Sequence, residues 1–228
     1  MADVRREVIV RRLLLVVVMI AGFVGAVAVA RRPRVARTAP APGFDPVVVG
    51  TIEAAGWRAY YERDFLTGFR LLLRLMGDQF GLGPFDALRT AHAAVRAQMA
   101  FAPAENDLAA ARRWLVRFYR RSPRRDGVAP ADLADAELDY WIVHRRIVDE
   151  RDKTPLIDAL ARLHALLFGG SEAAMRPSAE QRTFACNAVD RITGQRSTDP
   201  AVDWSLARNH LIAAYQLALS AAPSITNA

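Results

Sequence analysis

The chain of 228 residues carries a formal net charge of +7, and most of this charge lies near its N-terminus. Residues 1–43 contain eight arginines and two acidic side chains, whereas the rest of the chain contains 23 basic and 22 acidic residues. A nearly neutral domain lacks the basic footprint of nucleic-acid-binding proteins, so no nucleic-acid partner is expected. The single cysteine, Cys186, excludes a thiolate cage for a metal ion within one chain.

The first element in chain order is an apolar run of 18 residues, Leu13 to Ala30, which predicts a transmembrane anchor. A helix of this length reaches about 27 Å, close to the roughly 30 Å core of a bilayer. Arginine pairs flank the run, and residues 1–12 form a basic tail in front of it. A cleaved signal peptide is the alternative, because Ala28-Val29-Ala30 fits a cleavage site.

The arginines around this run are balanced, with four before it and four closely after it, so the positive-inside rule barely orients it. A short tail with four arginines is a poor candidate for translocation, which favours an extracytoplasmic domain. The unpaired Cys186 favours a cytoplasmic domain, because proteins of an oxidising compartment usually have paired cysteines or none. Thirty arginines against one lysine indicate a high-GC bacterial genome, so the expected location is a bacterial cytoplasmic membrane. Small residues of the run would let a partner helix or a second copy approach closely, or else they only reflect a chain rich in alanine: Ala21, Gly22, Gly25, Ala26 and Ala30.

The remainder of the chain predicts an all-α fold, a bundle of about seven or eight helices. Residues 31–46 are rich in proline and alanine and are expected to form a linker, whereas residues 222–228 form a tail. Between them, residues 47–221 show helical spacing of apolar side chains and no sustained alternation, so no sheet is expected. Residues 122–130 contain two prolines and a glycine and would be the boundary if the domain has two lobes.

Helix starts are marked by capping residues and by prolines in the first turn. The fifth helix of the domain is expected to run from Ala131 to Asp152, and Ser178 with Gln181 forms a capping box for the seventh. The expected starts are Asp45-Pro46, Asp64, Pro84, Asn106 or Asp107, Ala131, Thr154, Ser178 and Asp199.

Three polar residues fall on faces that are expected to be buried. Glu137 and His144 share the apolar stripe of the fifth helix, and Glu53 lies beside aromatic residues of the first. These side chains would form an acid/base or metal pocket, or else structural pairs that hold helices in register, with Arg112 as one candidate partner. Glu-x-x-His pairs, His-Glu-x-x-His, Gly-x-Ser-x-Gly and a phosphate loop are all missing, so no cofactor is expected.

A second group of candidates is basic and lies at the end of the fourth helix. Arginines alternate there with aromatic side chains, a composition that suits anionic lipid headgroups. The alternative is that the acidic helix that follows neutralises them. The residues expected to contact an anionic surface are Arg113, Arg117, Arg120 and Arg121.

Three segments resemble a group of uncharacterised all-helical proteins from high-GC bacteria. They are Trp57 to Phe65, Ala102 to Asp107 and Trp141 to Arg145. The resemblance covers most of the domain but not the anchor, and it implies no activity, cofactor or functional residue.

The function expected first is that of a non-enzymatic, single-pass accessory or scaffolding protein that docks on other membrane proteins. Its expected partners are membrane lipid and either a membrane protein or a second copy, which would pack on the transmembrane helix. One alternative is a metal-dependent or acid/base enzyme with a pocket around Glu137 and His144. The other is an anionic-lipid-binding domain.

Overall fold

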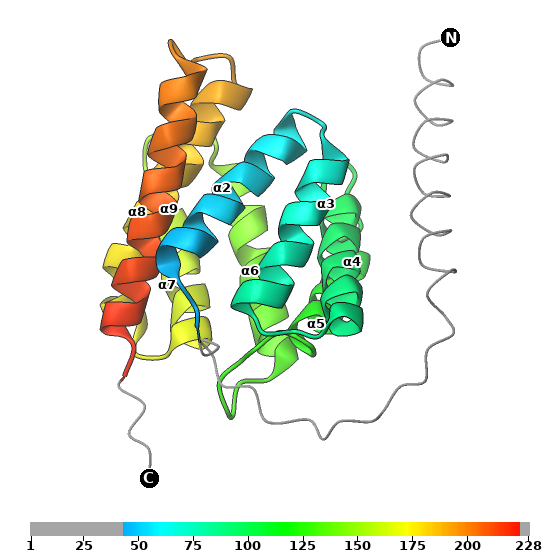
Figure 1. The fold of residues 1–228 in the computed structure, drawn as a ribbon. Helices are drawn as coiled ribbons and strands as arrows, with labels where there is room; N and C mark the ends of the chain where they lie inside the picture. Colours follow the sequence, from blue (N-terminus) through cyan, green and yellow to red (C-terminus); the bar gives the residue numbers. More distant parts are fainter. Residues whose placement is uncertain (1–42, 224–228) are drawn as a thin grey trace. The chain divides into compact units, whose positions relative to one another are not determined.

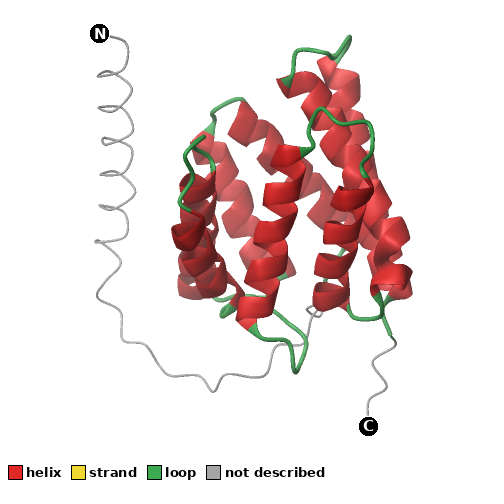
Figure 2. Ribbon diagram, turned by 180° about the vertical axis from the view of Figure 1, so that it is seen from behind, coloured by secondary structure: helices red, strands yellow, loops and turns green. Residues whose placement is uncertain are grey.

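The computed structural model describes residues 43–223, and in this part of the chain the fold is all-α, as predicted. Eight α-helices and one short π-helical turn occur there, and no strand (Figure 1, Figure 2). They are α2 (Pro46–Tyr61), α3 (Phe65–Arg74), the π-helical turn η1 (Leu75–Gln79), α4 (Pro84–Phe101), α5 (Leu108–Tyr119), α6 (Pro130–Arg146), α7 (Thr154–Phe168), α8 (Glu172–Thr193) and α9 (Pro200–Ala221).

Several predictions concern residues outside the described range. These are the basic tail 1–12, the anchor 13–30 with its small residues, most of the linker 31–46, and residues 224–228 of the tail. The linker as predicted is one residue too long, because Pro46 is already the first residue of α2. Within residues 43–223, no helix combines the length and the apolar character that crossing a bilayer requires.

Local signals account for most of the helix starts. Asp45, Asp64, Asp107 and Asp199 each accept hydrogen bonds from backbone N–H groups of the following turn. In addition, α2, α4, α6, α7 and α9 have a proline in the first turn, where a missing N–H group costs nothing. The expected starts of these elements are therefore confirmed to within a residue or two.

The fifth predicted helix, α6, ends at Arg146 rather than at Asp152. The Lys153 ammonium group explains the early end, because it donates to the carbonyl oxygens of Ile147 at 2.7 Å and Val148 at 2.9 Å. These carbonyls would otherwise accept bonds from a further helical turn.

The predicted start of the seventh helix at Ser178 is wrong. The helix, α8, begins at Glu172, and the hydroxyl of Ser171 caps it by accepting from the backbone N of Ala174 at 3.1 Å. Ser178 lies inside α8, fully buried, and donates to the carbonyl oxygen of Ala214 at 2.7 Å. Its hydroxyl therefore links α8 to α9.

Neighbouring helices lie side by side and are joined at alternating ends, and the first helix of the domain also packs on the last (Figure 1). Gly50 allows this close approach of α2 and α9. A Cβ atom at Gly50 would lie 2.7 Å from the backbone nitrogen of Ile212. The helix pair is thus held closer than any side chain at position 50 would permit.

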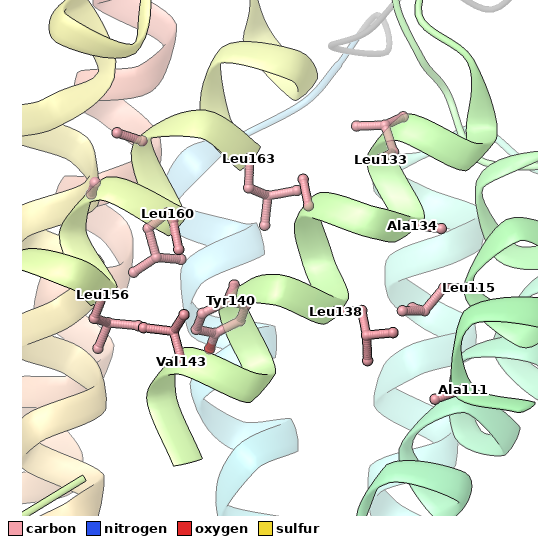
Figure 3. Close-up of a cluster of buried hydrophobic side chains, with 14 of the residues drawn as sticks. Ala111, Leu115, Leu133, Ala134, Leu138, Tyr140, Val143, Leu156, Leu160 and Leu163 are labelled. Carbon is pink, nitrogen blue, oxygen red and sulfur yellow. The ribbon is translucent and has the colours of Figure 1, made fainter. Parts of the chain in front are cut away.

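The largest apolar core surrounds α6 (Figure 3). Leu133 and Tyr140 of this helix are buried together with Leu115 of α5 and Leu160 of α7. The core therefore includes residues on both sides of the loop 122–130, and α5 and α6 pack directly on each other.

Candidate functional site

Arg182 of α8, a residue that is only 9% exposed, lies at the centre of a buried polar network. Its guanidinium group donates to the two carboxylate oxygens of Glu53 on α2, at 2.5 Å and 3.2 Å. The hydroxyl of Tyr215 on α9 donates to Glu53 at 2.6 Å and accepts from Arg182 at 3.3 Å. These three side chains connect α2, α8 and α9 in the interior.

Aromatic rings enclose the same guanidinium group. Its central carbon lies 5.6 Å from the ring centroid of Trp57, 5.8 Å from that of Tyr140 and 6.0 Å from that of Tyr215. Burial alone would lower the pKa of Arg182, but the Glu53 carboxylate and the tyrosine hydroxyls outweigh it and raise this pKa well above its ordinary value. Arg182 is therefore a permanent buried cation.

Glu137 of α6 is bonded to two neutral donors. Its carboxylate accepts from the hydroxyl of Tyr119 at 2.8 Å and from the indole nitrogen of Trp141 at 3.0 Å. Burial raises the pKa of Glu137, and the nearby charge of Arg182 and these two hydrogen bonds oppose that rise. Hydrogen bonds thus hold the carboxyl group of Glu137 between α5 and α6, although burial disfavours its charged form.

His144 has a separate partner. Its Nε2 atom lies 3.0 Å from a carboxylate oxygen of Asp190, which links α6 to α8. Glu53, Glu137 and His144 are therefore each bonded to different side chains. Within residues 43–223, no group of three or more His, Cys, Asp or Glu side chains has the geometry to hold a metal ion.

Arg112, the candidate partner for these inward groups, faces the surface. It makes a two-pronged ion pair with Asp135 of α6, at 2.5 Å and 2.8 Å. The acidic helix α6 thus neutralises one arginine of α5. This contact agrees with the alternative that α6 neutralises the basic residues at the end of α5.

Burial holds two further titratable core groups, His164 and Cys186, in their neutral forms. His164 is buried, and burial together with Arg182 lowers its pKa to about 3. Its Nδ1 atom lies 2.8 Å from the hydroxyl of Ser178, which already donates to a carbonyl, so Nδ1 carries the proton. Burial raises the pKa of Cys186 to about 12, which keeps its thiol protonated. The Nδ1 atom of His210, a half-buried residue, lies 2.8 Å from the side-chain oxygen of Gln181.

Exposed arginines of α5 form the second candidate site. We call Arg113, Arg117 and Arg120 the α5 arginine surface; all three are exposed, and none has a carboxylate partner among the described residues. The other arginines near the end of α5 have structural contacts. Arg121 is half-buried and donates to the carbonyl of Arg117 at 3.0 Å, Arg124 donates to the carbonyls of Tyr119 and Arg120, and Arg125 packs against Gly169.

Stacking on Trp114 fixes part of this surface. The guanidinium carbon of Arg117 lies 4.4 Å from the Trp114 ring centroid, and that of Arg96 from α4 lies 5.0 Å away. His92 contacts the same ring edge-on, at 5.3 Å between centroids. Burial lowers the pKa of His92, and the charges of Arg96 and Arg117 lower it further, as expected in a positive field.

Two hollows lie near these helices. Arg112, Arg113, Val116, Arg117 and Arg120 line a shallow one of about 220 Å³. The other, of about 470 Å³, has both signs of charge on its wall: Asp132, Asp135, Arg162, Ala165, Leu166, Gly170, Ser171 and Glu172. Neither hollow is lined by Glu53, Glu137 or His144.

Sequence reasoning missed Arg182, the centre of the buried network. A signal for it exists, because Arg182 is seven residues after Met175 and four before Cys186, both buried on α8. In comparisons with protein-family models, with curated proteins and with solved structures, nothing matched this chain.

Proposed function

We propose that this chain is a non-catalytic accessory protein of a bacterial membrane, anchored by residues 13–30, whose helical domain binds anionic phospholipid headgroups. The binding surface is the α5 arginine surface. The observation that supports it is a set of three exposed guanidinium groups beside a stacked tryptophan, with no carboxylate partner within the described range.

Electrostatics favours an anionic partner for these residues. Arg113 and Arg117 are four residues apart on one helix, and Arg120 follows three residues later, so their charges repel one another. Each arginine near an anionic bilayer contributes about 1 kcal/mol, so three contribute about 3 kcal/mol, or roughly 150-fold in binding. The amphipathic ring of Trp114 is suited to the same interface.

The alternative of an acid/base enzyme has less support. Glu53, Glu137 and His144 are engaged with Arg182, Tyr119 and Asp190, the arrangement expected of pairs that hold helices in register. Docking on another membrane protein remains part of the proposal through the small residues of the anchor, Ala21, Gly22, Gly25, Ala26 and Ala30.

The proposal is tested with the full chain reconstituted into lipid nanodiscs of phosphatidylcholine, alone or mixed with phosphatidylglycerol. The emission of Trp114, isolated as the difference from Trp114→Phe, is quenched by a lipid that carries a nitroxide on its headgroup. We expect stronger quenching of Trp114 in the anionic discs than in the neutral discs. In Arg113→Gln/Arg117→Gln/Arg120→Gln this difference between the two kinds of disc should be lost. Equal quenching in neutral and anionic discs contradicts the proposal.

The matched control removes the same charge elsewhere. Arg70, Arg146 and Arg208 are exposed on α3, α6 and α9. The variant Arg70→Gln/Arg146→Gln/Arg208→Gln has the same net charge as the first variant. It should still show stronger quenching in anionic than in neutral discs, because its α5 arginine surface is intact.

A further inference from the structure

We infer that the hollow on the α5 arginine surface is a phosphate-binding site that prefers the phosphomonoester headgroup of a lipid to a phosphodiester headgroup. This inference rests on the proposed function, since the membrane supplies the ligand.

The hollow has the size and lining that a phosphate group needs. Four arginines border it, and Val116 contributes the apolar part of its wall. Its volume of about 220 Å³ is several times the roughly 30 Å³ that one water molecule occupies in the liquid. A phosphate group and part of its hydration shell therefore fit among the guanidinium groups.

Two of the four arginines are held in place before any ligand arrives. Arg112 uses Nε and Nη2 for Asp135, which leaves its Nη1 group free of that pair. Arg117 is stacked on Trp114. Side chains that are ordered in advance lose less conformational entropy on binding, so the hollow is a better site than four flexible arginines would be.

The charge of the hollow selects the class of phosphate. Asp135 offsets Arg112, so the net charge comes from Arg113, Arg117 and Arg120. A phosphomonoester presents three terminal oxygens and a charge of about −1.5 to −2 near neutral pH, whereas a diester presents two such oxygens and a single charge. Guanidinium groups pair best with two oxygens at once, so the monoester satisfies more of these donors.

The lipid source follows from the anchor and from Trp114. A headgroup in the same bilayer as residues 13–30 is present at high effective concentration, which a phosphate ion in solution is not. The Trp114 ring, on which Arg117 stacks, is half-buried and amphipathic, which suits the headgroup region.

The test uses the full chain in phosphatidylcholine nanodiscs that contain either phosphatidic acid or phosphatidylglycerol, adjusted to the same surface potential. The readout is the lipid fraction that gives half-maximal quenching of Trp114. We expect phosphatidic acid to act at about one tenth of the fraction that phosphatidylglycerol needs, a ratio that an additional charge near three guanidinium groups can supply. In Arg113→Gln/Arg120→Gln the two lipids should become equal, whereas Arg70→Gln/Arg146→Gln should keep the ratio.

The possible results separate this inference from the proposed function. Equal responses to the two lipids in the unaltered chain overturn the monoester preference and leave anionic-lipid binding standing. No response to either lipid contradicts both. Displacement of phosphatidic acid by inorganic phosphate at the same low concentration would overturn the lipid as the source and indicate a site for soluble phosphate. Circular dichroism of each variant verifies that the helices are retained.

Discussion

The ion pair between Glu53 and Arg182 gives a sharp test of the buried network. Glu53→Gln keeps the shape of the side chain and removes its charge, so the guanidinium group of Arg182 stays in the interior without its main counter-ion. Breaking a buried pair from one side costs about 3–5 kcal/mol. The remaining charge of Glu137 and the three aromatic rings around Arg182 offset part of this cost, so we expect a loss of about 3 kcal/mol.

The assay is urea unfolding of the full chain in detergent micelles, followed by circular dichroism at a wavelength that reports helix. The midpoint should fall without a change in the slope, since the surface exposed on unfolding is the same. Glu62→Gln is the matched control, because its pair with Arg58 is 53% to 55% exposed, and we expect it to cost less than about 1 kcal/mol.

A second variant makes the test specific to the pair. Glu53→Gln/Arg182→Met removes both charges, and its destabilisation should be smaller than the sum of the two single effects, by about 1–3 kcal/mol. If Glu53→Gln behaves like Glu62→Gln, or if the two single effects simply add, the pair does not hold these helices together and the account of the network is wrong.

Two further predictions concern stability. Gly50→Ala should lower the free energy of unfolding by about 2 kcal/mol, because its Cβ atom would lie 2.7 Å from the backbone nitrogen of Ile212. Gly56→Ala in the same helix has open space around it and should raise the free energy of unfolding slightly. Equal thermal melting temperatures for the two variants would contradict the close crossing of α2 and α9. His164, with its pKa lowered to about 3 from the ordinary 6.5, stays neutral in the fold while the unfolded chain takes up a proton below pH 6.5. The contribution of neutral His164 to the free energy of unfolding is therefore complete above pH 6.5 and falls by about 1.4 kcal/mol per pH unit as the pH drops towards 3. In urea unfolding at a series of pH values, His164→Gln should lose stability less steeply with acid than the unaltered chain. An equal dependence on pH in the two proteins would refute this prediction.

Local sequence signals were sufficient for the class of the fold and for most helix starts. The capping aspartates and first-turn prolines act within a few residues, so they can be recognised without knowing the neighbours of a helix. The two larger errors, at the end of α6 and the start of α8, arise where contacts with other parts of the chain determine the boundary. Lys153 ends α6 through bonds to two carbonyls, and Ser178, which looks like a cap, donates to α9 instead.

The sequence predicts which residues of the candidate site face inward on each helix, but not which residues of other helices they contact. A helical wheel places Glu53 and Glu137 inward, and both are indeed bonded in the interior. Which partners they have depends on which helices meet, and one sequence does not contain that information. Arg112 pairs with Asp135, and Arg182, from a helix whose start was misplaced, is the buried cation.

The measurement that tests the central claim most directly is photo-crosslinking of the full chain in nanodiscs that contain anionic phospholipid with a photoreactive headgroup. Mass spectrometry then identifies the crosslinked residues. Binding through the α5 arginine surface predicts crosslinks concentrated between residues 110 and 121, and their loss in Arg113→Gln/Arg117→Gln/Arg120→Gln. Crosslinks spread evenly over the domain, or concentrated at the exposed Phe65 and Leu66 of α3, would contradict the account.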